Sequence, residues 1–98
     1  FALSLVLLAG CSWVDLRPGA EQVRLVSAAE VVDCQAKGSV LAQTRSSVGF
    51  YDRSAETLQA ELATLARNQA VVMGANRLVT DSVIGSDGSQ KFRAFLCP

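Results

Sequence analysis

The chain has 98 residues, of which nine are lysine or arginine, nine are aspartate or glutamate and none is histidine. A formal net charge of zero predicts no broadly basic surface, which argues against nucleic acid as a partner. The lack of histidine removes the commonest general base and the commonest metal ligand. We therefore expect no enzyme, no cofactor and no metal site.

The N-terminal residues combine an apolar run with a cysteine. Phe1 to Leu8 is almost wholly apolar, and Leu8-Ala9-Gly10-Cys11 has the order of a bacterial lipobox. An apolar region followed by small residues is typical of a signal peptide and its cleavage site. In a lipobox the cysteine then receives a diacylglycerol, and its new amine is acylated, usually with palmitate. We predict a signal peptide over 1–10, truncated because it lacks an initiator methionine, and lipidation at Cys11.

A buried strand or a short membrane helix is the alternative interpretation of this run. About ten residues are too few to span roughly 30 Å of hydrocarbon, which needs about twenty. Ser12, rather than an aspartate, follows the cysteine, and this order is typical of lipoproteins sent to the outer membrane. We expect a lipid anchor in that membrane and a domain in the periplasm.

The predicted domain occupies residues 22–98, behind the lipidated cysteine and a short tether over 11–21. Ten extended residues reach at most about 35 Å, so the domain is expected close to its membrane. Trp13 is predicted either at the lipid headgroups or packed on the domain. A domain of this size is marginally stable without further support.

Cys34 and Cys97 remain once Cys11 is assigned to the lipid. An even number of cysteines in a small exported domain predicts a disulfide. Two free buried thiols are the alternative. A bridge that closes a loop of about sixty residues stabilises by roughly 4 kcal/mol on the chain-entropy model.

Hydrophobic periodicity predicts the order strand, strand, helix, strand, strand. The strands are expected over 22–27, 31–44, 78–84 and 90–97, and the helix over 54–73. One helix can bury its apolar stripe on only one face of a small sheet. The predicted fold is therefore α+β, a two-layer sandwich in which a four-stranded β-β-α-β-β sheet packs on one helix. The strands on either side of the helix are expected to run parallel.

Turn and cap residues add local predictions. Gly38 predicts a bulge inside the second strand, and residues 28–30 predict a short connection. Ser54 is expected to cap the start of the helix and Gly74 to end it. Residues 85–88 predict a hairpin turn.

The helix is expected to bury one stripe of apolar side chains. The stripe comprises Leu58, Leu62, Leu65, Ala66, Val72 and Met73. Gln69 falls in the middle of this stripe, and a buried amide must find hydrogen-bond partners. It is predicted either to bond neighbouring backbone or to contact a ligand in a pocket.

Few residues suggest a binding site. Phe50 and Tyr51 are adjacent in a polar loop, where they either form a contact surface or fold back to cover the core edge. Asp81 and Asp87 flank the predicted hairpin turn, which is ordinary for a solvated turn. No serine lies in an arrangement that would activate it as a nucleophile, so no catalytic residue is predicted.

Three segments carry motifs that occur together in a known family. They are Val32 to Gly38, Leu65 to Asn76 and Phe95 to Pro98. They match a Cys-Gln/Glu-x-x-Gly strand, an Arg-Asn-x-Ala-x-x-Met/Leu-Gly-Ala/Gly-Asn helix end and a C-terminal aromatic-x-Cys-Pro. With the lipobox, this combination resembles the small bacterial lipoproteins of the domain-of-unknown-function family 4156. The resemblance implies a fold and an envelope location, and it implies no activity.

A more distant similarity concerns the segment from Val23 to Val26 and the Ala28-Ala29-Glu30 that follows. This segment is similar to the signalling domain of the outer-membrane stress-sensor lipoprotein of the Rcs phosphorelay. The leading hypothesis is a non-enzymatic lipoprotein that binds an envelope component or a protein partner. The alternative is an envelope-stress signalling module that acts by exchange of partners.

Overall fold

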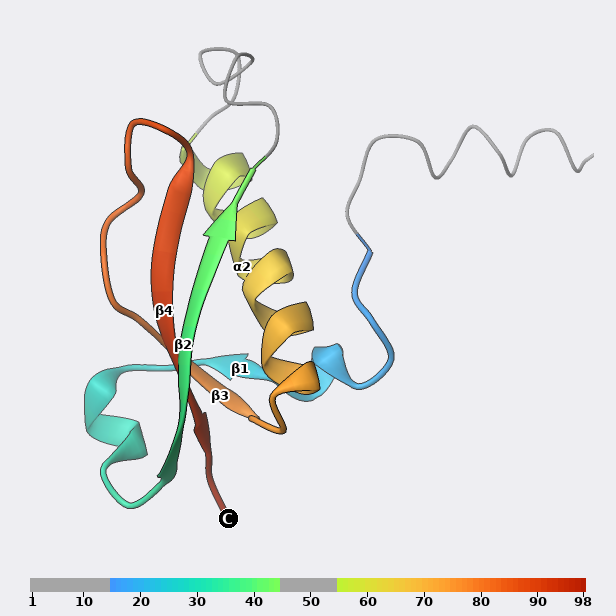
Figure 1. Cartoon of the computed structure of the whole chain (residues 1–98), viewed down its shortest axis with the longest axis vertical. Coiled ribbons are helices and arrows are strands. Elements are labelled where there is room, and N and C mark those ends of the chain that lie inside the picture. The colour runs from blue at the N-terminus through green and yellow to red at the C-terminus, as the bar shows by residue number, and fades with distance from the viewer. Residues whose placement is uncertain (1–14, 45–54) are drawn as a thin grey trace, which may run out of the picture.

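The computed structural model describes residues 15–44 and 55–98, which form one sheet packed on one α-helix (Figure 1). The strands are β1 (Arg24–Leu25), β2 (Gln35–Gln43), β3 (Arg77–Thr80) and β4 (Ser89–Leu96), and the helix is α2 (Ala55–Val72). Two short 3-10 helices, η1 (Ala20–Gln22) and η2 (Ala28–Val31), flank β1 in the sequence. The predicted α+β class and the β-β-α-β-β order are confirmed.

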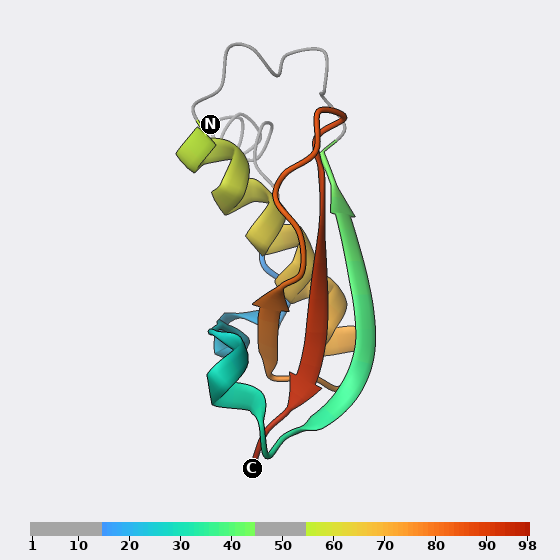
Figure 2. The same ribbon diagram turned by 90° about the vertical axis from the view of Figure 1, so that its left-hand side faces the viewer.

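The sheet has the strand order β1-β3-β4-β2. Strand β1 runs parallel to β3, and β4 runs antiparallel to both β3 and β2. Strands β2 and β3 therefore point the same way, as expected for a crossover through α2, but β4 lies between them (Figure 2). Strands β1 and β2 form the two edges.

The second strand begins at Gln35, later than predicted, because the preceding residues form η2. The backbone N–H and hydroxyl of Ser27 donate to the Glu30 carboxylate at 3.3 and 3.2 Å. Such local bonds between a side chain and nearby backbone compete with a strand ladder. Val32, inside the range predicted for this strand, therefore lies before it, and its side chain is 77% exposed.

Gly38 is the bulge that the sequence predicts. The register of β2 against β4 shifts between Ala36 and Gly38, and Gly38 has a φ of 135°. A Cβ atom built on Gly38 would lie only 3.0 Å from Met73 Cε. Glycine at this position therefore permits both the backbone conformation and the close approach of the helix end.

The buried row of α2 follows every fourth residue. It comprises Leu58, Leu62, Ala66 and Ala70, each no more than 4% exposed. Gln69 is exposed and Val72 is 62% exposed, so their predicted places in the buried stripe are wrong. Figure 2 shows α2 inclined to β4 and β2. Residues spaced by four form a row that is inclined to the helix axis. An inclined helix can therefore keep this whole row, from Leu58 to Ala70, against the sheet.

The sheet carries a separate apolar cluster on each face. The main cluster lies against α2, and its largest fully buried side chains are Phe92, Leu62, Leu78 and Val23. A smaller cluster lies on the other face and consists of Val31, Val79 and Phe95 with Val26, Cys34 and Cys97 around them. Strand β4 supplies both, because successive side chains of a strand point to opposite faces.

The helix also binds the segment that precedes the first strand. The Asn68 amide accepts from the backbone N–H of Arg17 at 2.7 Å and donates to the carbonyl of Asp15 at 2.9 Å. The Arg67 guanidinium donates to the carbonyls of Val23 and Glu21 at 2.9 and 3.2 Å. Residues 15–21 are therefore packed on the helix, so the folded part of the chain begins before residue 22.

Helix α2 ends as the sequence predicts, with Gly74 at a φ of 78°. Its expected cap, Ser54, lies outside the described residues. None of the described helices is long and apolar enough to span a bilayer.

The row of every fourth residue yields a paired prediction for α2. Leu62→Ala should lower the free energy of unfolding by about 2–5 kcal/mol, because it leaves a cavity in the core. Gln69→Leu, a change in the same helix, should alter it by less than about 0.5 kcal/mol, because the side chain is exposed. Urea unfolding followed by circular dichroism measures both. A large loss of stability in the Gln69→Leu protein would contradict the exposed placement.

Candidate functional site

The structure places the predicted site residues in two groups. Cys34 and Cys97 form a disulfide, which confirms the predicted pairing. Cys11, Phe50 and Tyr51 lie outside the described residues, so lipidation and the aromatic contact surface stay predictions.

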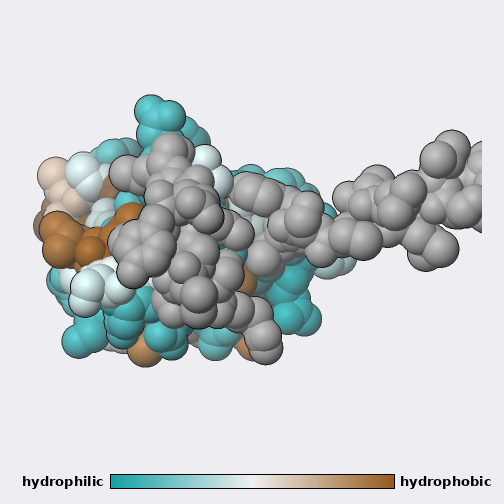
Figure 3. Space-filling model, turned by 90° about the horizontal axis from the view of Figure 1, so that it is seen from above, coloured by the Kyte–Doolittle hydropathy of each residue, from teal (hydrophilic) through white to brown (hydrophobic). Residues whose placement is uncertain are grey.

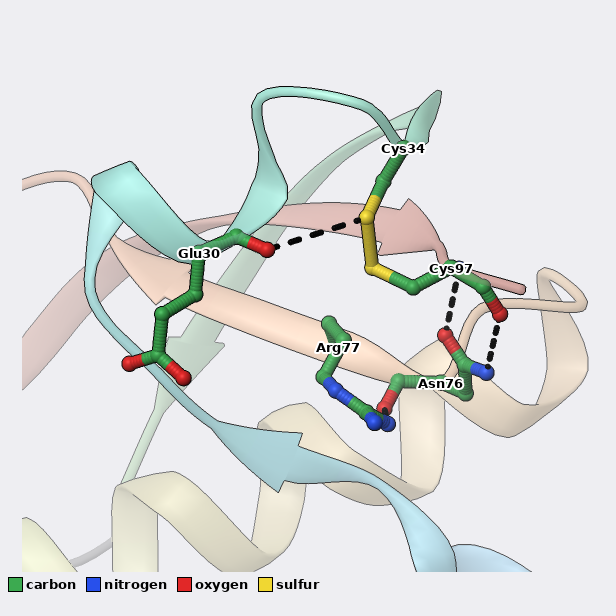
Figure 4. The surroundings of a disulfide bond; sticks show 5 residues. All are labelled: Glu30, Cys34, Asn76, Arg77 and Cys97. Atoms are coloured by element: carbon green, nitrogen blue, oxygen red, sulfur yellow. Dashed lines mark hydrogen bonds between the residues drawn. A yellow bond between two sulfur atoms is a disulfide. The ribbon is translucent and has the colours of Figure 1, made fainter.

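The disulfide joins the start of β2 to the end of β4. Cys34 directly precedes Gln35, Cys97 directly follows Leu96, and these two neighbours are register partners in the antiparallel pair. The Cα atoms of the two cysteines are 4.5 Å apart. The bridge thus continues the β2–β4 pair by one covalent step. Cys34 Sγ lies 3.9 Å from the carbonyl oxygen of Glu30 in η2 (Figure 4).

The side chain of Asn76 forms hydrogen bonds to both backbone groups of Cys97. The backbone N–H of Cys97 donates to Asn76 Oδ1 at 2.8 Å, and Asn76 Nδ2 donates to the Cys97 carbonyl at 2.9 Å (Figure 4). The Asn76 amide thereby makes the two hydrogen bonds that a neighbouring strand would make to Cys97. Asn76 ends one of the sequence motifs, but the motif predicts no role for it. Its position between the helix end and the next strand is the one sequence feature that points to a structural role.

Other residues of the three sequence motifs (32–38, 65–76 and 95–98) also make structural contacts. Arg67 and Asn68 bind the backbone of the N-terminal segment, Gly38 admits Met73, and Gly74 ends α2. The motifs therefore mark residues that hold the helix, the sheet and the first segment together.

Three arginines lie on the face of the sheet opposite α2. Arg24 is the register partner of Arg77 across β1 and β3, and Arg77 is the partner of Phe95 across β3 and β4. Arg93, two residues before Phe95, places its guanidinium carbon 5.3 Å from the centre of the Phe95 ring, within the range of a cation–π contact. We call Arg24, Arg77, Arg93 and Phe95 the arginine face.

None of these three arginines forms an ion pair within the described part of the chain. Arg24 and Arg93 are exposed and Arg77 is partly buried. Arg77 donates to the carbonyl of Asn76 at 2.8 Å, but no carboxylate among the described residues forms an ion pair with any of the three. Sequence reasoning missed this group because positions 24, 77 and 93 share one face of the sheet only through the strand order.

A family model described as "Domain of unknown function (DUF4156)" matches residues 14–97. The match includes every described strand and helix, the disulfide, Asn76 and the arginine face. The chain belongs to this family. No match was found among curated proteins or among solved structures.

The loop between β3 and β4 of this DUF4156 domain contains the two aspartates noted in the sequence. Asp87 Oδ1 accepts from the Ser89 hydroxyl at 2.7 Å and from the Ser89 N–H at 3.2 Å. These bonds lower the pKa of Asp87, which is exposed. Neither aspartate belongs to a set of three or more potential metal ligands within the described ranges.

Val83 in this loop is 84% exposed, and Figure 3 shows hydrophobic residues on this side of the molecule.

Buried polar groups near this loop form hydrogen bonds with their neighbours. Gln90 is 3% exposed; its amide accepts from Gln59 at 2.8 Å and donates to the Ser82 carbonyl at 3.0 Å. Across the described ranges, no buried side-chain nitrogen or oxygen lacks a partner. The buried amide that the sequence placed at Gln69 is therefore found at Gln90, where it has a structural role.

The disulfide yields a prediction about stability in reducing conditions. Reduction should lower the free energy of unfolding by about 2–5 kcal/mol, the usual loss for a small domain that depends on one bridge. The melting temperature with and without reductant measures the change, and a Cys34→Ser/Cys97→Ser double variant should not respond to reductant. Rapid alkylation of both thiols in the oxidised protein would contradict the pairing.

Asn76 yields a second prediction, with Asn68 as its matched control. Asn76→Leu should cost about 1–3 kcal/mol of unfolding free energy, because it leaves the N–H and the carbonyl of Cys97 without their partner. Asn68→Leu should cost less, because the groups it releases lie at the surface and can bind water. Urea unfolding of both variants compares them. An Asn76→Leu loss no greater than that of Asn68→Leu would show that the amide does not carry this role.

Proposed function

We propose that this DUF4156 protein is a lipid-anchored protein of the bacterial outer membrane. Its domain would face the periplasm and bind an envelope component or a protein partner without catalysing a reaction. The observation that supports the anchor most strongly is the apolar run that ends at Leu8-Ala9-Gly10-Cys11. Ser12 supports the outer membrane as its destination.

The packing of the first described residues bears on how such an anchor would act. Asp15 and Arg17 are bound to Asn68 on α2, so the folded part begins close to the proposed lipid. Positions 11 and 15 are four residues apart, which corresponds to at most about 14 Å of extended chain. With Cys11 acylated, the domain would be held against the membrane surface rather than on a long tether.

A binding role is supported by the composition and by the arginine face. The chain contains no histidine, so a serine nucleophile would lack its usual base. The arginine face presents charged groups with no acidic partner in the described ranges. Arginine is enriched where proteins form interfaces and recognise anionic groups. This face is therefore the contact surface we propose.

Acylation is tested by changing the cysteine in a bacterium that expresses the chain with a complete signal peptide. Cys11→Ala should release the protein from membranes or leave it as an uncleaved precursor, because no thiol remains to carry the lipid. Membrane fractionation and the intact mass measure both outcomes. Ser12→Asp is the matched change: it keeps the lipid but should move the protein away from the outer membrane. Unchanged fractionation and unchanged mass in Cys11→Ala would overturn the anchor.

A further inference from the structure

The sheet ends at one short edge strand and one long edge strand. Strand β1 has two residues and strand β2 has nine. Short strands, lysines and bulges are devices that protect a sheet edge from pairing with another chain. In β2 the lysine at position 37 and the bulge at Gly38 stand near the start of the strand. The last five residues, Ser39 to Gln43, contain no charge, no proline and no glycine.

This stretch of β2 turns alternate hydrogen-bonding groups out of the sheet. The backbone N–H of Thr44, on the β4 side of the strand, donates to the carbonyl of Gly88 at 3.1 Å. Residues of an antiparallel strand bond to their partner strand alternately. The N–H and carbonyl groups of residues 39, 41 and 43 therefore point away from β4. No described strand pairs with this outer edge of β2.

Leu41 lies in the middle of the stretch and exposes its side chain. It is 64% exposed, whereas its neighbours Val40 and Ala42 are buried in the core against α2. Leu41 points to the face opposite α2, because successive side chains of a strand alternate. An added strand would bond to the outward backbone groups and cover this leucine.

We propose that β2 pairs antiparallel with β2 of a second copy of this chain, about a two-fold axis at Leu41. Two four-stranded sheets then form one continuous sheet, and the same patch of each copy makes the interface. Leu41 faces Leu41 of the second copy, and Ser39 faces Gln43, so apolar meets apolar and polar meets polar. No like charges face each other within this stretch. Its residue pattern therefore fits its own copy.

The side of α2 that borders this edge also suits a second copy. Glu61 accepts from the Thr44 hydroxyl at 3.0 Å near one end of β2, and Met73 lies close to Gly38 near the other. Helix residues four apart lie on one side, so Leu65, which follows Glu61 by four, borders the middle of the edge. Leu65 is partly exposed at the margin of the core. The two-fold axis brings this side of both helices to the interface, where Leu65 adds apolar surface.

The arrangement is compatible with the proposed lipid anchor. A two-fold axis through an antiparallel pair of identical edge strands is perpendicular to the sheet, so both α2 helices lie on one face. Asp15 and Arg17 are bound to Asn68 on α2, which puts both N-terminal segments on that same face. Lipids on the two Cys11 residues can therefore enter one membrane. Confinement there raises the effective concentration of each copy for the other.

Disulfide trapping between added cysteines tests the pairing and its register. Residues opposite each other in such a pair have Cα atoms about 5.5 Å apart, within reach of a disulfide. Leu41→Cys should therefore form a covalent dimer by itself. Ser39→Cys and Gln43→Cys should form one when co-expressed but not separately, because each is offset from its own copy by four residues, roughly 13 Å. All three positions lie on one face of one strand and are exposed, so they serve as controls for one another.

The variants are expressed with a complete signal peptide in cells treated with diamide, which oxidises thiols. Non-reducing gels then measure the covalent dimer, and the wild type measures any background from Cys11. We expect at least about tenfold more dimer from Leu41→Cys than from Ser39→Cys or Gln43→Cys alone, because only the first has its own copy within reach. The melting temperature establishes that each variant is folded.

A second variant tests the pairing without a cysteine at the axis. Leu41→Lys, added to both members of the co-expressed Ser39→Cys and Gln43→Cys pair, should lower trapping about tenfold, because two lysines would face each other. Val32→Lys is the matched control, since Val32 is 77% exposed and lies outside β2. It should leave trapping unchanged.

Three results would overturn the proposal. Equal trapping of all three single variants would indicate collision or parallel pairing, strong trapping of Ser39→Cys alone would indicate another register, and absence of trapping at every position would exclude the second copy. Whole cells are oxidised and the gel counts dimers wherever the protein resides. The Cys11→Ala experiment measures the anchor, so the pairing and the anchor can fail separately.

Discussion

The hydrogen bonds of Asn76 join the strands at one end of the sheet. Its backbone N–H donates to the carbonyl of Phe95 at 2.9 Å, and its carbonyl accepts from the N–H of Arg24 at 3.2 Å. Its side chain holds both backbone groups of Cys97, which is bonded to Cys34. One residue therefore connects β1, β4 and the start of β2, where a short edge strand would otherwise have little support.

The two faces of the sheet differ because β4 is covered unequally. Phe92 and Ala94 meet α2 over the length of the main core. On the other face, η2 is the one described element that covers the sheet, and it closes a small cluster around Phe95 with the help of the disulfide. The rest of that face is left to polar and charged residues, and the arginine face results from this partial cover. The same arrangement that stabilises the domain thus leaves a surface available for contact.

The N-terminal segment is part of the folded domain over its described residues. Arg67 and Asn68 bind that segment to α2, so it cannot act as a free tether over its described part. A lipid placed a few residues earlier would then position a folded domain rather than merely retain it.

Features that depend on neighbouring residues were predictable before the fold was known. Periodicity predicted the order of strands and helix, the conformational freedom of glycine predicted the bulge at Gly38 and the helix end at Gly74, and the cysteine count predicted the Cys34–Cys97 bridge. These features follow from local backbone preferences or from an even number of thiols in a small exported domain.

Contacts between side chains that are distant in the sequence depend instead on how the whole domain packs. The inclination of α2 on the sheet buries Ala70 and exposes Gln69. A stripe parallel to the helix axis predicts that Gln69 is buried. The bonds of Ser27 to Glu30 replace the start of a strand by η2. The strand order brings Arg24 beside Arg77, because pairing between distant segments depends on packing across the whole sheet and leaves no trace in the local pattern.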